Sequence, residues 1–295
     1  MRRMPPARMG TVLDMTDDSD LPPPSDRGLA VVTGASTGIG RAFAEILASE
    51  GFDLVIAADE GLIHDVADDL RVTGRRVTSV HVDLSAGVGV EHLHEVAMAQ
   101  PGPVTVGILN AAIGVHGRFD EADIEAQLRL IDLNVRSTVH LASLLTRDMV
   151  MRAQGRLLLV SSIAGKGPGP GHATYAASKA FVHSFAEAIR HELRGTGVCV
   201  TSLLPGPTDT AFFERAGMQH TKVAQGPKDS AETVARQGFD ALMAGKDQVV
   251  AGAARNRVQA AGAGLVPDPL AAGFAARQTQ EDDDTVAEDR GRSKG

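Results

Sequence analysis

Short apolar runs alternate with stretches of helical periodicity along most of this chain. The apolar runs are nearly continuous, which is typical of strands that are buried on both faces of a sheet. We expect strands at 28–34, 52–59, 76–84, 104–112, 155–162, 198–205 and 247–252, and helices at 39–51, 62–72, 90–99, about 121–151, 174–193 and 230–245. This alternation predicts an α/β fold: one doubly wound parallel sheet of about seven strands with helices on both faces. Ligands of such sheets bind at the carboxyl ends of the strands.

The two ends of the chain depart from this pattern. Residues 1–27 are rich in proline and lack the apolar run of a signal peptide, so we expect a disordered leader. Residues 276–295 are charged and poor in large aliphatic side chains, which predicts a disordered tail after a domain at 28–275. No stretch approaches the ~20 uninterrupted apolar residues of a membrane span. A soluble cytoplasmic protein is therefore the default expectation.

Composition narrows the classes of partner. The formal net charge of −8 argues against nucleic acid and against anionic membranes as partners. Cys199 is the only cysteine, so the chain forms no intrachain disulfide and no cysteine-based metal cluster.

A glycine-rich turn joins the first predicted strand to the first predicted helix. Gly34, Gly38 and Gly40 lie there in the segment TGASTGIG. Glycines at such a turn let a pyrophosphate approach the backbone, and the helix N-terminus offers free N–H groups to the anion. Glycines also serve ordinary turns, so this segment alone is weak evidence for a dinucleotide site.

Further motifs raise that evidence to a family resemblance. The spacing G-x-x-x-G-x-G, the pair Tyr175 and Lys179 in Y-x-x-x-K, Ser162 and Asn134 follow one another in the order found in the short-chain dehydrogenase/reductase family. The segments ILNAAIG and PGPTDT match two further family motifs, and the resemblance covers roughly residues 28–255. It implies a single Rossmann-type domain and hydride transfer between a nicotinamide cofactor and a secondary alcohol or ketone.

The resemblance also implies roles for individual residues. Asn134, Ser162, Tyr175 and Lys179 would form the catalytic apparatus, with Tyr175 as general acid/base. The implied cofactor-binding residues are Gly34, Ser36, Thr37, Gly38, Ile39, Gly40, Asp59, Asp83, Leu84, Asn110, Ala111, Tyr175, Lys179, Pro205, Gly206, Thr208 and Thr210.

Elementary chemistry agrees with the Tyr175–Lys179 assignment. Residues four apart on a helix share a face, and a nearby ammonium favours phenolate, so we expect Lys179 to lower the pKa of Tyr175 toward working pH. An isolated helix tyrosine would instead be packing material, and only the other motifs reverse that interpretation. By strand alternation, either Ser161 or Ser162 faces the cleft, and family spacing favours Ser162. Asn134 in a helix either holds a water in a proton relay to the lysine or serves as a kink or packing amide.

The loop after the second strand bears on the choice of cofactor. Ala58 occupies the position where NAD-dependent members carry an aspartate, and Asp59 occupies the position of the NADP-selective arginine. Asp59 and Glu60 would repel a 2′-phosphate, which favours NAD, although Arg41 leaves NADP as an alternative. Asp83 either lies beside the adenine or caps the following helix. Leu109 and Ala112 depart from the family's N-N-A-G segment.

The substrate cannot be read from the chain. His116, His172 and His220 lie in glycine-rich or irregular segments that resemble a mobile lid, and their spacing does not suggest a metal site.

Alternative functions are an NADP-dependent 3-ketoacyl-type reductase and a non-catalytic dinucleotide-sensing protein. By resemblance, the helices at about 121–151 and 172–194 would form the interface of a homodimer or homotetramer.

Overall fold

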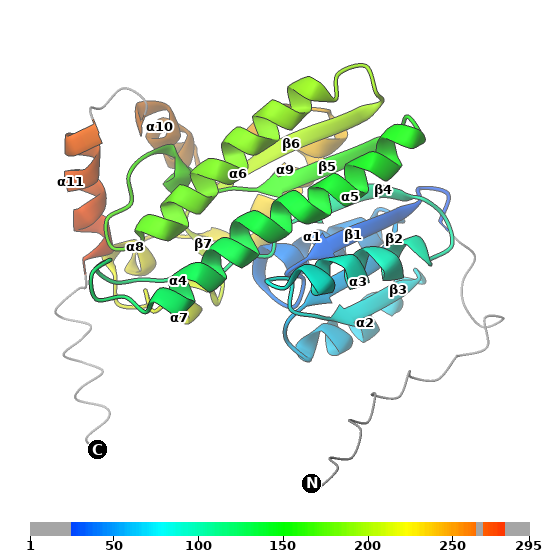
Figure 1. Ribbon diagram of the computed structural model, residues 1–295, viewed down its shortest axis with the longest axis horizontal. Coiled ribbons are helices and arrows are strands. Elements are labelled where there is room, and N and C mark those ends of the chain that lie inside the picture. Colours follow the sequence, from blue (N-terminus) through cyan, green and yellow to red (C-terminus); the bar gives the residue numbers. More distant parts are fainter. Residues whose placement is uncertain (1–24, 264–267, 281–295) are drawn as a thin grey trace, which may run out of the picture.

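Seven parallel strands form the central sheet of the protein in a computed structural model that describes residues 25–263 and 268–280 (Figure 1). The strand order is β3-β2-β1-β4-β5-β6-β9, so the predicted doubly wound sheet of about seven strands is confirmed. The strands are β1 (Leu29–Thr33), β2 (Asp53–Ala58), β3 (Val77–His81), β4 (Val104–Leu109), β5 (Gly155–Val160), β6 (Val198–Pro205) and β9 (Gln248–Ala251). Chain order reverses at β1, which pairs with β2 on one side and β4 on the other. The connections therefore diverge at this point and leave a crevice at the carboxyl edge.

Helices cover both faces of the sheet. The larger ones are α1 (Gly38–Ser49), α2 (Leu62–Arg71), α3 (Gly87–Met98), α4 (Ile124–Ile131), α5 (Thr138–Met151), α6 (Ala173–Glu192) and α9 (Ala231–Met243). One core cluster joins α1, α2 and α9 to the sheet, and a second joins α3, α5 and α6 to its other face. The helix expected at 121–151 is interrupted by a π-helical turn, η2 (Asp132–Ser137), between α4 and α5.

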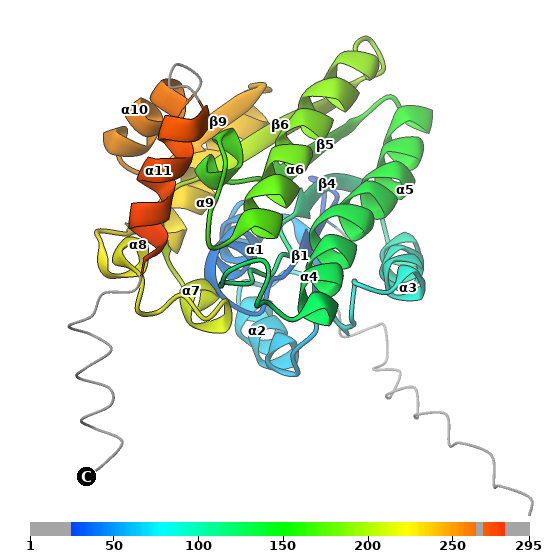
Figure 2. The same ribbon diagram turned by 60° about the vertical axis from the view of Figure 1, so that its left-hand side comes forward.

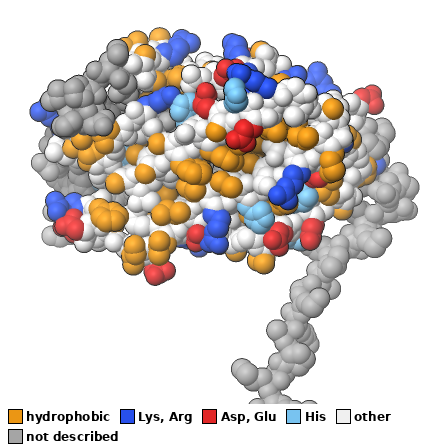
Figure 3. All heavy atoms as spheres, turned by 45° about the horizontal axis from the view of Figure 1, so that its top comes forward, with side chains coloured by type: hydrophobic (Ala, Val, Ile, Leu, Met, Phe, Trp, Pro, Cys, Tyr) orange, Lys and Arg blue, Asp and Glu red, His pale blue; other side chains and the backbone are white. Residues whose placement is uncertain are grey.

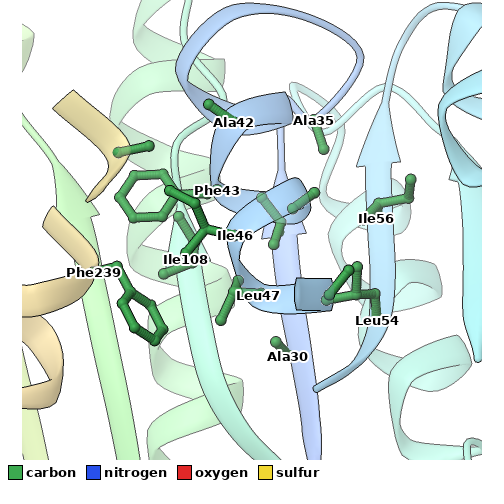
Figure 4. Close-up of a cluster of buried hydrophobic side chains, with 14 of the residues drawn as sticks. Ala30, Ala35, Ala42, Phe43, Ile46, Leu47, Leu54, Ile56, Ile108 and Phe239 are labelled. Carbon is green, nitrogen blue, oxygen red and sulfur yellow. The ribbon is translucent and has the colours of Figure 1, made fainter. Parts of the chain in front are cut away.

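Small residues allow the close packing of the first cluster. Phe43 of α1 is completely buried between the sheet and α9 (Figure 4). A Cβ atom at Gly238 of α9 would lie 2.7 Å from Cζ of Phe43 and 3.1 Å from Cδ2 of Leu203. Glycine at this position is therefore what lets α9 approach the aromatic ring.

Short elements gather at the carboxyl edge of the sheet. They are η3 (Ile163–Lys166), β7 (Thr208–Asp209), α7 (Phe212–Arg215), α8 (Lys222–Gln225), β8 (Asp229–Ser230), α10 (Ala254–Ala263) and α11 (Asp268–Thr279). Figure 2 shows α11 beside the loop that leads into α6. Thr279 Oγ1 donates a hydrogen bond of 2.8 Å to the carbonyl oxygen of Pro170 in that loop.

The ends of the domain differ from those expected. Ser25 N–H donates to Asp53 Oδ2 at 2.8 Å, so the ordered domain begins before residue 28. Helix α11 continues to Thr279, so residues 276–279 of the expected tail are helical. The rest of the expected leader and tail, at 1–24 and 281–295, lies outside the described residues. Within the described ranges, no helix is long and apolar enough to cross a membrane.

Candidate active site

A cavity of about 920 Å³ opens at the carboxyl ends of the strands, where the crevice was expected. The loop after β1, the ends of β2, β4, β5 and β6, and the helices α6, α7, α10 and α11 contribute to its walls. Every residue expected to bind cofactor lines this cavity except Gly40. Ser162 also lines it, whereas Asn134 does not.

The glycine turn brings the backbone close to the cavity. Gly34 has a φ of +65°, and a Cβ there would lie 2.9 Å from both Cα of Ala111 and Nδ2 of Asn110. A Cβ at Gly40 would lie 2.1 Å from the carbonyl oxygen of Gly34, so Gly40 acts by close packing of α1 on the turn. The first turn of α1 contains no acidic side chain, and no side chain caps its free N–H groups. The loop therefore offers bare backbone donors to an anion.

Asn110 ties the ends of β1 and β4 together. Its Nδ2 donates to the carbonyl oxygens of Thr33 and Gly34 at 3.0 and 3.1 Å. The hydroxyl of Thr33 accepts from the backbone N–H groups of Asn110 and Ala111 at 2.9 and 3.0 Å. These bonds hold the glycine turn against the opposite wall of the crevice, even though Leu109 and Ala112 depart from the family motif.

Tyr175, Lys179 and Ser162 meet in the middle of the cavity. Nζ of Lys179 lies 5.9 Å from the centre of the Tyr175 ring, as expected for residues on one face of α6. The lysine is buried, and its Nζ donates to the carbonyl oxygen of Val160, the last residue of β5, at 2.8 Å. The Ser162 hydroxyl hydrogen-bonds the phenol of Tyr175. Sheet, η3 and α6 therefore converge on one phenol.

The pKa of Tyr175 does not move in the direction expected from the sequence. Burial raises it to about 12, and the hydrogen bond with Ser162 only partly offsets that rise. Burial also lowers the pKa of Lys179 to about 8. In the protein without a ligand, desolvation is therefore the largest influence on the pKa of this phenol, and the lowering expected from Lys179 is not seen.

The two neighbouring serines have different partners. Ser161 is buried, and its hydroxyl donates to the carbonyl oxygen of Lys179 at 2.6 Å, which fastens β5 to α6. Ser162 follows the strand as the N-cap of η3, where its hydroxyl also accepts from Ala164 N–H at 3.1 Å. Of the two serines, Ser162 is the one that interacts with the phenol.

Asn134 lies in the π-helical turn and is 1% exposed. Its Oδ1 accepts from Ile113 N–H at 2.9 Å, and its Nδ2 donates to Ile113 O at 2.9 Å and to Ser178 Oγ at 3.1 Å. The amide therefore joins the loop after β4 to the helix that carries Tyr175. These direct contacts are those of a packing amide, and the water relay to Lys179 stays a prediction.

Two arginines from distant parts of the chain reach the acidic residues after β2. Arg129 of α4 pairs with Asp59 at 3.5 Å and with Asp83 at 3.2 Å. Arg215 of α7 pairs with Glu60 at 3.0 Å. Neither contact is evident from the sequence, because both arginines are far from this loop along the chain.

Arg41, the cation that the sequence did suggest, lies elsewhere. It pairs with Glu45 at 2.9 Å and with Asp69 at 3.1 Å, and these acids raise its pKa. It does not line the cavity. This arginine is therefore engaged on the surface of α1 and α2.

Asp83 lines the cavity without capping a helix. Its Oδ1 accepts from Ser85 N–H at 2.9 Å in a local turn, while α3 begins later, with Ala86 as its N-cap. Partial burial opposes ionisation, but the hydrogen bonds from Ser85 and the charge of Arg129 hold the pKa of Asp83 below its ordinary value. The carboxylate therefore stays charged at the mouth of the cavity.

The remaining walls around Tyr175 come from the glycine-rich or irregular segments in which a mobile lid was expected. The ring centre of Phe212 lies 5.1 Å from that of Tyr175, and the ring centre of His172 lies 6.1 Å from it. A Cβ at Gly114 would lie 2.7 Å from Cζ of Phe212, so glycine makes room for this ring. No group of three or more His, Cys, Asp or Glu side chains that could hold a metal ion occurs in the described part of the chain.

Comparisons with known proteins agree with the motifs. Residues 28–220 match the model of the family described as short chain dehydrogenase. The chain is 33% identical over 207 residues to an uncharacterized oxidoreductase of Staphylococcus saprophyticus, which covers 69% of this chain and 88% of the relative.

Two solved structures with the same fold contain a dinucleotide. One is a short chain dehydrogenase/reductase of Burkholderia phymatum in complex with NAD, with TM-score 0.70, 28% identity, and coverage of 76% of this chain and 88% of that chain. The other is a short-chain dehydrogenase of Sphingobium yanoikuyae in complex with NADPH, with TM-score 0.71, 27% identity, and coverage of 87% and 99%.

Proposed function

This chain belongs to the short-chain dehydrogenase family and is an oxidoreductase, and from that premise we propose that it interconverts a secondary alcohol and a ketone with a nicotinamide dinucleotide. Ser162 and Lys179 both lie beside the phenol of Tyr175, inside the cavity that the glycine turn also lines. This arrangement is the observation that carries the proposal. A packing tyrosine would not need this cavity or these partners.

The residues present suit a dinucleotide. Its pyrophosphate would bind the bare N–H groups at the start of α1, where a Cβ at Gly34 would close the space. The adenosine end would lie toward Asp59, Asp83 and Leu84, and the nicotinamide end toward Tyr175, where Pro205 and Gly206 also line the cavity. When bound, the cofactor supplies or accepts the hydride, and its oxidised ring brings a positive charge.

The protein's own residues handle the proton. Tyr175 donates its phenolic proton to the substrate oxygen as a ketone is reduced, and it removes that proton when an alcohol is oxidised. The Ser162 hydroxyl binds the same oxygen and polarises the carbonyl. Lys179, fixed to Val160 O at 2.8 Å, stabilises the phenolate that remains. Asn134 acts at a distance, by holding the loop after β4 on α6.

We further propose NAD as the preferred cofactor, with NADP as the alternative. Asp59, Glu60 and Asp83 bring three carboxylates to this end of the cavity against the two arginines that pair with them. A 2′-phosphate would meet a net negative charge, and Arg215 would have to leave Glu60 to bind it. Separate titrations with NADH and NADPH test this choice, and tighter binding of NADPH would overturn it.

Replacement of the phenol tests the proposed chemistry. With NADH or NADPH and a panel of ketones, Tyr175→Phe should lower turnover by ~10²–10⁴-fold, because only the proton donor is lost. Dinucleotide binding, measured by calorimetry, should be largely unchanged.

Matched serine variants serve as controls for this test. Ser162→Ala should lose activity, whereas Ser161→Ala should keep it, because the Ser161 hydroxyl contacts only backbone. If Tyr175→Phe retains most of the wild-type activity, the proposed mechanism is wrong. If the wild type binds dinucleotide but consumes it with no ketone, the non-catalytic sensor is the better interpretation.

We also propose a homodimer or homotetramer in which α5 and α6 form the contact. Hydrophobic side chains gather across the middle of the face shown in Figure 3. On α6, Phe181 is 42% exposed and stacks on Phe185, and on α5, Met151 is 78% exposed. Light scattering in solution would measure the assembly, and a monomer at all concentrations would contradict it.

A further inference from the structure

The wall of the cavity around Tyr175 is largely apolar on the substrate side. Phe212 packs near the phenol, and Phe213, Met218 and Val223 continue the wall from the segment that follows β7. Helices α10 and α11 add Val258 and Ala275, and also the polar residues Gln259, Gln278 and Thr279. Because apolar walls select apolar ligands, a substrate of this site has a hydrophobic body.

No arginine in this wall is available for an anionic substrate. Among the described residues that line the cavity, the arginines are Arg215, which pairs with Glu60 at 3.0 Å, and Arg255, which pairs with Asp229 at 3.4 Å. Lys179 lines the cavity too, but it is buried and bonded to Val160 O as part of the proposed machinery. A carboxylate or phosphate on the substrate would therefore enter without a free cationic partner.

His172 is a polar side chain of this wall that lies beside Tyr175. It lines the cavity as the residue before α6, and its ring centre lies 6.1 Å from that of Tyr175. Its Nδ1 is buried and has no hydrogen-bond partner among the described residues, and the same is true of Nδ1 of His116 nearby. Burial, with a smaller contribution from His116, lowers the pKa of His172 to about 4, so the ring is neutral at pH 7.

The neutral imidazole of His172 lines the cavity beside Tyr175, so it can form a hydrogen bond with a ligand bound there. A neutral imidazole offers one donor and one acceptor, which suits a hydroxyl or a carbonyl better than a carboxylate. His172 also has no capping role on α6 that would explain its presence, because its side chain makes no cap hydrogen bond.

The position of His172 is held by a part of the chain beyond the family match. That match ends at residue 220, whereas Thr279 of α11 bonds Pro170 O at 2.8 Å, two residues before the histidine. A Cβ at Gly171 would lie 3.0 Å from Oγ1 of Thr279 and 3.4 Å from Cε1 of His116. Helix α11 therefore fixes the loop that carries His172 and keeps it against the cavity.

From this arrangement we infer that His172 recognises a hydroxyl or second carbonyl group next to the reacting carbon of a neutral, otherwise apolar substrate. The inference rests on the proposed alcohol/ketone chemistry and names the class of molecule on which it acts: hydroxyketones, diketones and the corresponding diols. It excludes keto acids and phosphorylated substrates as the preferred class.

Three phenyl ketones test this inference, since they differ only in the group beside the carbonyl. Acetophenone has a methyl group there, 2-hydroxyacetophenone a hydroxymethyl group, and benzoylformate a carboxylate. We expect the wild-type enzyme with its cofactor to have the highest kcat/KM for 2-hydroxyacetophenone and the lowest for benzoylformate. The hydroxyl also activates the ketone chemically, so the decisive quantity is the change of the hydroxymethyl-to-methyl ratio between variants.

His172→Leu should reduce that ratio about tenfold, the effect of one lost hydrogen bond between neutral groups. His172→Gln should keep most of the ratio, because a neutral amide also donates and accepts. His92→Leu is the matched control, since His92 is exposed on α3 outside the cavity, and it should change nothing. Activity of each variant on acetophenone shows that it is folded.

Two results would overturn the inference: a ratio that is the same in His172→Leu and wild type, or a preference for benzoylformate. The enzyme could reduce other ketones but none of these three. In that case, calorimetry with the Tyr175→Phe variant and bound dinucleotide replaces the rate measurement. Equal affinity of this variant for acetophenone and 2-hydroxyacetophenone then rejects the role of His172. Those outcomes leave the proposed function intact. Failure of the proposed function is a different result, in which no ketone at all consumes NADH or NADPH.

Discussion

The ionisation of the proposed catalytic phenol can be measured directly, because Tyr175 is the only tyrosine and the chain has no tryptophan. Phenolate absorbance therefore reports on this residue alone. Burial raises the pKa of Tyr175 to about 12, compared with about 10 for a free tyrosine. At pH 11 we expect roughly a tenth of the phenol to be ionised in the protein without cofactor, whereas an unperturbed tyrosine would be about nine tenths ionised.

The same shift has a consequence for stability. A shift of about two pKa units corresponds to roughly 2–3 kcal/mol in favour of the neutral phenol. The folded pKa lies above the unfolded one, so this contribution is complete below about pH 10 and is lost as the pH rises toward about 12. The free energy of unfolding should fall by about 1.4 kcal/mol per pH unit in that window from this group, as measured by urea denaturation.

Lys179 provides the control for this reasoning. Its pKa of about 8 makes it neutral at pH 11, so Lys179→Met should leave the tyrosine titration of the cofactor-free protein nearly unchanged. Circular dichroism at each pH confirms that the fold is intact. A phenol more than half ionised at pH 11 in folded protein, or a midpoint raised by about a unit in Lys179→Met, would refute the conclusion that burial dominates.

Two further predictions concern the framework of the site. Asn134→Ala should lower the free energy of unfolding by about 2–4 kcal/mol, because both backbone groups of Ile113 lose their partner. Ser178→Ala removes only the bond with Asn134 and a local bond to the carbonyl oxygen of Tyr175, and should cost about 1 kcal/mol. Equal losses in urea denaturation would contradict this. Gly238→Ala should lower the free energy of unfolding by about 1–3 kcal/mol, because the added methyl group crowds the Phe43 ring. Gly273→Ala on α11 is the control, because the space around Gly273 is open and the variant should not be destabilised. Similar thermal midpoints for the two variants would show that the packing argument is wrong.

The parts of this molecule that follow local rules were accessible from the sequence. Continuous apolar runs gave the strands, and the i,i+4 spacing of Tyr175 and Lys179 placed both on one face of α6. The π-helical turn around Asn134 was not accessible in this way. Asn134 in this turn contacts Ile113 and Ser178, which are distant along the chain, so the periodicity within the helix does not indicate these contacts.

The ion pairs of the loop after β2 were also not accessible from the sequence. The loop after β2 looks purely acidic along the chain, yet its partners lie 70 and 155 residues away, in Arg129 and Arg215. Arg215 ends α7, and Phe212, which packs beside Tyr175, begins it. One short helix thus contacts both the acidic end of the cavity and its reactive centre. We therefore expect a change in the ion pair at Glu60 to disturb Phe212 as well, because both ends of this short helix are in contact with the cavity walls.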